Sequence, residues 1–172
     1  MRAHLKMSGT SYRLDETYVK VGTEWKYLYR AVDSSGNTIE FMLSVKREVC
    51  AAKRFFKKLK RADHRRLPFT IGTDKHASYP EEFTTSIKEK VLPSDYKLRR
   101  VKYLNNVIEQ DHRFIRRRWR AMQCFRSFHT AERAIEGIEA MHVMQKGQVK
   151  RLDGRDAAEQ AQFVASLFGV AA

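Results

Sequence analysis

Alternating apolar and polar residues fill the first part of the chain. Residues 11–21, 25–32 and 38–45 are rich in β-branched and aromatic side chains, and the turn sequence DSSGN separates the second run from the third. Runs of this kind, bounded by turn residues, are typical of strands joined in hairpins. The pattern therefore predicts a three-stranded antiparallel meander.

The apolar spacing then changes from the period of a strand to that of a helix. Residues 48–62 carry their apolar side chains on one side of a helix; these are Val49, Ala52, Phe55, Phe56 and Leu59. A short apolar strand is predicted at 69–73, and a helix with Pro80 near its first turn at 78–92. Residues 96–104 are predicted to form a fifth strand or extended segment.

Three further helices are predicted, at 105–122, 127–146 and 155–168. This order is neither a uniform strand–helix alternation nor all-β, and it indicates an α/β fold with a mixed five-stranded sheet flanked by helices. We expect residues 1–126 to form the core domain, with the helices of 127–172 packed on it or extending it.

The helix at 105–122 divides into two sides at 100° per residue. One side is a predicted buried stripe, formed by Leu104, Ile108, Ile115, Trp119 and Met122. The adjoining flank holds one carboxylate among polar and cationic side chains, which are Asn105, Glu109, His112, Arg113, Arg116 and Arg120. Asn105 and Asn106 are both candidates for the N-cap.

The charge balance points to a polyanionic partner. The 172 residues have a net charge of +14 with 42% hydrophobic content, which is the balance of a globular, strongly basic protein. The basic stretches 53–66 and 97–120 are expected to bind the backbone of such a polyanion without reading its sequence. A basic protein with no nucleic-acid role is the alternative.

Other classes of protein find little support. The two cysteines, Cys50 and Cys124, have no Cys-x-x-Cys spacing, so neither a zinc site nor a disulfide framework is predicted. No apolar run is long enough to cross a bilayer and no signal peptide is evident, so we expect a cytoplasmic protein. His76, His112 and His129 have no evident nucleophile partner, and surface or capping positions are predicted for them.

Three carboxylates stand out by position. Asp15 lies inside the first strand, Asp74 directly follows the strand at 69–73, and Glu109 begins the long helix. Taken singly, they have ordinary explanations: an edge-strand charge, a turn or N-cap residue, and an ion pair with Arg113 one helical turn on. As a set, three hard oxygen donors suit Mg²⁺ or Mn²⁺, and two such ions about 4 Å apart support phosphoryl transfer.

The motifs LDETY, WKYLYRAVDSSGNTIEFMLS, TDKHASYP and KYLNNVIEQDHRFIRRR together resemble the catalytic domain of D-D-E insertion-sequence transposases. The likeness is greatest to the "insertion sequence six" family and covers nearly the whole chain. The resemblance implies an RNase H-like, retroviral-integrase-like fold. It also implies metal-dependent cleavage and transfer of DNA strands, with two Mg²⁺ or Mn²⁺ ions, and assembly as a homodimer or larger complex on element ends and target DNA.

Carried over onto this sequence, the family's catalytic and metal-binding triad falls on Asp15, Asp74 and Glu109. The basic residue seven positions after the glutamate is Arg116. Residues expected near the DNA are Lys75, Lys102, Tyr103, Asn105, Asn106, Arg113, Arg116, Arg117 and Arg120.

The N-terminus departs from the family pattern. Members of the family usually carry a helix-turn-helix before the first aspartate, whereas 14 residues precede Asp15 here, so we expect an N-terminally truncated transposase. Two alternatives stay open. One is a catalytically silent DNA-binding or oligomerisation remnant, and the other is an RNase H-like nuclease that does not transpose.

Overall fold

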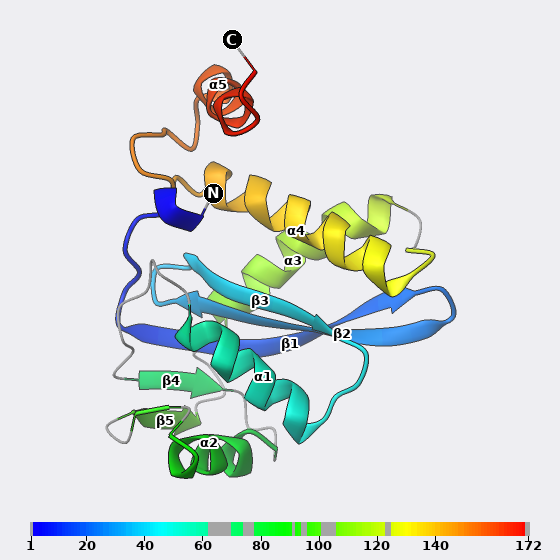
Figure 1. Ribbon diagram of the computed structural model, residues 1–172, viewed down its shortest axis with the longest axis vertical. Coiled ribbons are helices and arrows are strands. Elements are labelled where there is room, and N and C mark those ends of the chain that lie inside the picture. Colours follow the sequence, from blue (N-terminus) through cyan, green and yellow to red (C-terminus); the bar gives the residue numbers. More distant parts are fainter. Residues whose placement is uncertain are drawn as a thin grey trace.

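The computed structural model describes residues 2–61, 70–73, 78–90, 92–93, 96–100, 106–122 and 125–170 (Figure 1). Its five strands form one mixed sheet in the order β3-β2-β1-β4-β5. The strands are β1 (Ser11–Val21), β2 (Glu24–Asp33), β3 (Thr38–Ser44), β4 (Thr70–Thr73) and β5 (Lys97–Arg100). The first three pair antiparallel, while β4 pairs parallel to β1 and β5 parallel to β4. The meander and the mixed five-stranded sheet are therefore confirmed.

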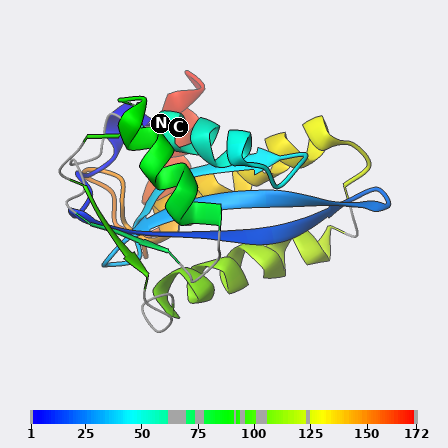
Figure 2. The same cartoon turned by 90° about the horizontal axis from the view of Figure 1, so that it is seen from below.

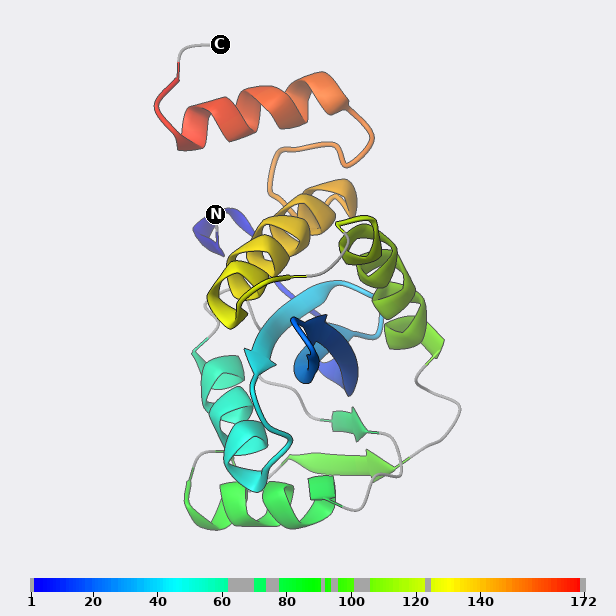
Figure 3. The ribbon, with the colours of Figure 1, turned by 90° about the vertical axis from the view of Figure 1, so that its right-hand side faces the viewer.

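Helices cover both faces of the sheet. They are α1 (Val49–Lys60), α2 (Ser78–Lys88), α3 (Asn106–Ala121), α4 (Phe128–Gln145) and α5 (Ala157–Leu167), with a short 3₁₀ turn at Arg2–His4. Figure 2 shows α1 and α3 on opposite faces of the strands, and Figure 3 shows α5 at the end of the molecule, away from the sheet. None of the described helices has the length and apolar character needed to cross a membrane.

The alternation along β1 explains how one strand serves two cores. Tyr12 and Leu14 are buried against α1 and α2, whereas Val19 and Val21 are buried on the other face against α3 and α4. Successive side chains of a strand point to opposite faces. Asp15 and Thr17 have the same parity as Val19, so they face α3.

The two helices on that face share one apolar core. Ile115 and Trp119 of α3 pack with Ile135 and Ile138 of α4 and with the odd-numbered side chains of β1. On the opposite face, four of the residues predicted for the buried side of α1 are buried, namely Ala52, Phe55, Phe56 and Leu59. The division of the chain at residue 126 stays a prediction, although α4 contributes to the core beside α3.

A buried arginine ties both helices to the sheet. Arg30 of β2 is fully buried and donates from Nε and Nη2 to the carboxylate of Glu139 on α4, at 2.7 and 3.0 Å. Its Nη2 also lies 2.6 Å from Oδ2 of Asp111 on α3. Burial by itself lowers the pKa of Arg30, but the two carboxylates outweigh it and the net shift is upward. The guanidinium therefore stays charged inside the fold.

Two sequence predictions were wrong in detail. The second helix ends at Lys88, not at residue 92, because Lys90 adopts a left-handed backbone with φ 56°. Met122 is 51% exposed, although the stripe on α3 was predicted to bury it. It lies in the turn after α3 ends at Ala121, where the helical spacing no longer holds.

We expect Arg30→Met to lower the free energy of unfolding by about 3–5 kcal/mol, because it leaves buried Glu139 without its cation and leaves Asp111 with Lys146 alone. Urea denaturation followed by circular dichroism measures this. The matched control is Lys46→Met, which removes the exposed cation paired with Glu48, and we expect a change of at most about 1 kcal/mol. Equal stability of the two variants would contradict the role given to Arg30.

Candidate active site at the β1–α3 interface

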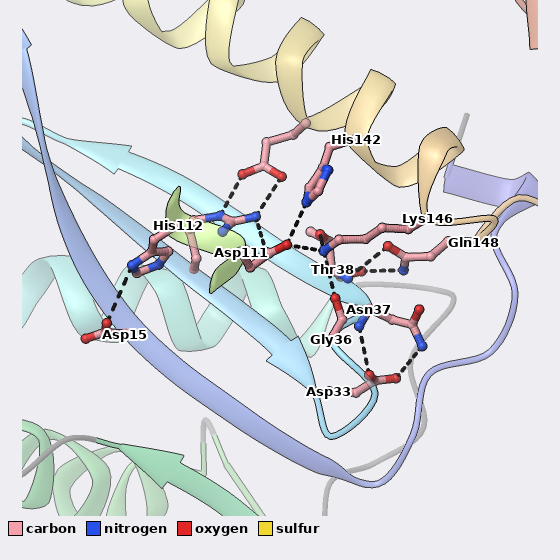
Figure 4. A network of polar contacts seen from close by, with 12 residues as sticks. Asp15, Asp33, Gly36, Asn37, Thr38, Asp111, His112, His142, Lys146 and Gln148 are labelled. Carbon is pink, nitrogen blue, oxygen red and sulfur yellow. Dashed lines mark hydrogen bonds and ion pairs between the residues drawn. The ribbon is translucent and has the colours of Figure 1, made fainter. Parts of the chain in front are cut away.

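Asp15 lies on the central strand of the sheet. Its neighbour across the ladder is Arg30, and its side chain is 24% exposed on the face covered by α3. β1 is a central strand of the sheet, and Asp15 directly follows Leu14, the last β1 residue that pairs with β4 among the described residues. Oδ2 of Asp15 lies 3.5 Å from Nδ1 of His112 on α3 (Figure 4).

His112 is buried, so the predicted surface or capping position is wrong for this histidine. Burial, followed by the charges of Arg30 and Arg116, lowers the pKa of His112 to about 3. The ring is neutral near pH 7 and has one N–H to donate, with Nδ1 facing the carboxylate. His112 thus contacts Asp15 without adding a charge.

Glu109 lies in the first turn of α3, three residues before His112, and is exposed. Residues three apart on a helix are neighbours on one side. Its side of the helix is therefore the side that meets Asp15. Within the described ranges, no ion pair joins Glu109 to Arg113, so the pairing considered from the sequence finds no support.

Arg116 is fixed against β1 one turn further along α3. It donates from Nε and Nη2 to Oγ1 of Thr17, at 2.8 and 2.5 Å. Arg113, Arg117 and Arg120 are exposed on the same helix, and Asn106 is exposed at its start. One helix thus carries the carboxylate, the histidine and a held guanidinium.

Several predicted residues lie outside the described ranges; these are Asp74, Lys75, Lys102, Tyr103 and Asn105. Within the described ranges, no group of three or more His, Cys, Asp and Glu side chains could hold a metal ion. Of the three carboxylates predicted to form the triad, the structure therefore places Asp15 and Glu109 only.

Asp111 is a polar residue that sequence reasoning missed. It is buried between α3 and α4, where His142 Nε2 lies 2.6 Å from its Oδ1 and Lys146 forms an ion pair with it (Figure 4). Burial raises the pKa of Asp111, but the hydrogen bond from His142 and the charges of Arg30 and Lys146 lower it by a larger amount. The net shift of this pKa is strongly downward. A signal was present: Asp111 lies between Ile108 and Ile115 on the buried side.

Solved structures with the same arrangement of strands and helices show the class of fold. The catalytic core domain of BIV integrase matches with a TM-score of 0.58 at 15% identity, covering 93% of this chain and 97% of that one. The HTLV-2 integrase catalytic core domain, in complex with magnesium in its trimeric form, matches with a TM-score of 0.56 at 13% identity. It covers 81% of this chain and 85% of the other. The fold is RNase H-like, of the retroviral-integrase type, as predicted.

Sequence relatives narrow the class to a family. Residues 9–148 match the family model described as a DDE domain, DDE_Tnp_IS240. The chain is 37% identical over 135 residues to the "Transposase for insertion sequence-like element IS431mec" of Staphylococcus aureus. This match covers 78% of this chain and 58% of the relative. The S. aureus "Transposase for insertion sequence element IS257 in transposon Tn4003" matches to the same extent.

The chain belongs to the D-D-E transposases of the "insertion sequence six" family, which confirms the resemblance found in the sequence. It spans 58% of the length of these curated relatives. A third relative, "Uncharacterized protein pYV0051" of Yersinia pseudotuberculosis, is 42% identical over 81 residues, covering 46% of this chain and 76% of its own.

The buried histidines predict a loss of stability in mild acid. Burial lowers the pKa of both His112 and His142, whereas in the unfolded chain each binds a proton below about pH 6.5. The unfolded state then holds more protons, so the free energy of unfolding falls as pH falls below 6.5, by up to about 1.4 kcal/mol per pH unit for each histidine. For His112 this window extends down to about pH 3.

Urea denaturation between pH 7.5 and 5, with a chelator present, measures this slope. His142→Gln is expected to reduce it, while His129→Gln, at an exposed position of α4, leaves it unchanged. A stability that stays constant from pH 7.5 to 5 would be incompatible with neutral histidines in the fold.

Proposed function

We propose that this chain is the catalytic domain of a transposase that cleaves DNA strands and transfers their ends in a metal-dependent reaction. The observation that carries the proposal is the alignment of α3 with β1. His112 meets Asp15 and Arg116 meets Thr17, so the two elements advance in the same direction past one another.

The rise of each element supports a place for Glu109 in the same site. From His112 to Arg116 the helix advances about 6 Å, and from Asp15 to Thr17 the strand advances about 7 Å. The two contacts are therefore separated by nearly the same distance along the helix and along the strand. Glu109 lies about 4.5 Å before His112 along the helix. This is the level of Leu14, one residue before Asp15 on β1.

The end of β4 falls at the same level. Leu14 pairs with Thr73, the last residue of β4 and the residue before Asp74 in the chain. Asp15 therefore directly follows Leu14 in the chain, and Asp74 directly follows Thr73. The two aspartates thus come after paired residues of adjacent parallel strands. This register supports convergence of Asp15, Asp74 and Glu109, although Asp74 itself lies outside the described residues.

The donors at this level fit a hard divalent cation. Asp15 and Glu109 offer carboxylate oxygens, Asp74 would add a third set, and Asp15 is partly open to solvent on the side of α3. A bound pair of Mg²⁺ or Mn²⁺ would supply activation of the attacking oxygen and stabilisation of the leaving oxygen.

The protein's own side chains would position the DNA. Thr17 holds Arg116 in one orientation beside Asp15, so its guanidinium can meet a phosphate without first being ordered. His112 would keep the Asp15 carboxylate turned toward α3 by donating from Nδ1. The exposed arginines of α3, together with Lys75, Lys102, Tyr103, Asn105 and Asn106, would contact the DNA around the reacting phosphate.

The partners proposed are the ends of a mobile element and a target DNA, and the chain would act in a homodimer or larger assembly on the bacterial nucleoid. The net charge of +14 supports a DNA partner, because backbone contacts release counterions in proportion to the phosphates neutralised.

Neutralising any one member of the triad is expected to abolish strand cleavage. Asp15→Asn, Asp74→Asn and Glu109→Gln should each reduce Mg²⁺-dependent nicking of a labelled duplex by about a hundredfold or more, because each removes a charged oxygen donor. Binding of the same duplex, measured by fluorescence anisotropy in chelator, should stay within about twofold.

Glu159→Gln, in the first turn of α5, is the matched control and should cleave normally. Undiminished nicking by any triad variant would refute that residue's assignment.

Loss of one exposed arginine on α3 should change the salt dependence of DNA binding. Arg117→Gln is expected to weaken binding to unrelated duplexes uniformly and to reduce the slope of log K against log salt by about 1. Arg133→Gln, which removes an exposed cation from α4, serves as the comparison and should leave the slope unchanged. The same loss in both variants would show diffuse attraction rather than a binding face on α3.

A further inference from the structure

A groove lies beside the part of β1 that follows Asp15, and the proposed reaction does not use it; at its far end Val21 bridges Phe125. In the described part of the sheet, β4 pairs only with Ser11–Leu14, while β1 continues to Val21. The groove has a volume of about 450 Å³, and its lining includes Thr17 and Lys20 of β1, Trp25 of β2 and Arg116 of α3.

One wall of the groove is aromatic and exposed. Tyr18 and Trp25 are 50% and 58% exposed, and their rings meet edge to face with centroids 6.4 Å apart. Tyr27 lies against Tyr18 at 5.4 Å. Large aromatic side chains are costly to leave in water, so a cluster of them beside a groove is typical of a binding surface.

The other wall is cationic. Arg116 and Arg120 of α3 line it, while Lys20 of β1, the cross-strand neighbour of Trp25, adds a cation on the aromatic side; no acidic residue is among the described lining. Arg116 is already oriented by Thr17. Aromatic faces beside fixed cations are the combination that binds single-stranded nucleic acid, with bases on the rings and phosphates on the cations.

The groove begins next to the proposed catalytic position. Thr17 is two residues from Asp15 on the same face of β1, a separation of about 7 Å, or about two nucleotide rises along a strand. A strand whose phosphate lay at Asp15 would reach the groove with the next one or two nucleotides.

We propose that this groove binds an unpaired nucleotide of the DNA strand beside the reacting phosphate, with its base on Tyr18 and Trp25 and its phosphate on Arg116 and Arg120. The inference rests on the proposed function for the identity of the strand, but the binding it describes needs no metal. A peptide strand added alongside β1 is the rival occupant. Lys20 of β1 opposes strand addition, because lysines at a strand edge discourage it, and favours phosphate.

The chain provides its own reporter for this site. Its two tryptophans, Trp25 and Trp119, both line the groove. A 12-nucleotide oligo(dT) strand is therefore expected to quench the intrinsic tryptophan fluorescence of the full chain in chelator. A blunt 12-base-pair duplex is expected to bind with little quenching. Quenching of equal extent by both would argue against an unpaired nucleotide.

The decisive comparison separates base stacking from backbone charge. The three probes are labelled oligo(dT), the same strand with abasic residues throughout, and the blunt duplex. Trp25→Ala should weaken oligo(dT) binding by about five- to a hundredfold, the range given by loss of one stacked base, and leave the other two within about twofold. Trp25→Phe keeps an aromatic ring and should restore most of the affinity. Phe168→Ala, which removes a 78% exposed ring near the end of α5, should change none of the three.

Two outcomes would overturn the proposal. In one, Trp25→Ala weakens all three probes equally or none of them. In the other, it changes the oligomeric state in sedimentation velocity and leaves oligo(dT) binding intact, which would make the groove a protein interface. Failure of the proposed function is separate, since it would appear as metal-dependent nicking that survives the triad substitutions, whatever the oligonucleotide results.

Discussion

The buried guanidinium of Arg30 is the constraint on which the rest of the arrangement depends. It binds Asp111 of α3 and Glu139 of α4 at once, so both helices have one position in which no buried charge is left without a partner. A buried ion pair adds little net stability compared with apolar packing, but breaking one is costly, and its effect is therefore to select a register. Arg30 is also the cross-strand neighbour of Asp15. The contact that sets the register of α3 thus sets it beside the candidate catalytic aspartate.

This register lets a single helix serve the core and the site together. Ile108, Ile115 and Trp119 point into the core, while Glu109 and the exposed arginines occupy the remaining circumference. The helix begins with its carboxylate and continues into cations, so the positive field increases away from Glu109. Arg30 and Arg116 already act on His112 in this way, since their charges add to the effect of burial in lowering its pKa. Such a field favours ionised carboxylates and bound phosphates.

The sequence predicted what depends on local pattern. Strand alternation located the meander, and the spacing of Phe55, Phe56 and Leu59 located the buried side of α1, because both patterns are fixed within a few residues. Asp111 and His112 were missed as buried residues because their partners are distant in the chain. Arg30 and His142 have no local relation to them, and a helical wheel ranks polar residues as exposed. For the site, sequence resemblance named three carboxylates. Folding brings α3 alongside Asp15, while convergence with Asp74 stays a prediction.

Among the described residues β1 extends well past β4, and this difference affects how a substrate strand would run. β4 has four residues and β1 has eleven, so the seven residues from Asp15 to Val21 extend about 24 Å past the last described β1–β4 pair. β2 supports this extension on one side, and α3 runs beside it with Arg116 and Arg120. The groove beside this extension has the arginines of α3 on one side and Tyr18 and Trp25 on the other, so a DNA strand entering at the carboxylates would meet both. Because β1 and α3 carry both the carboxylates and the groove, a shift of α3 would displace Glu109 and the arginines of the groove together, which makes the distance from the carboxylates to the groove a property of the fold.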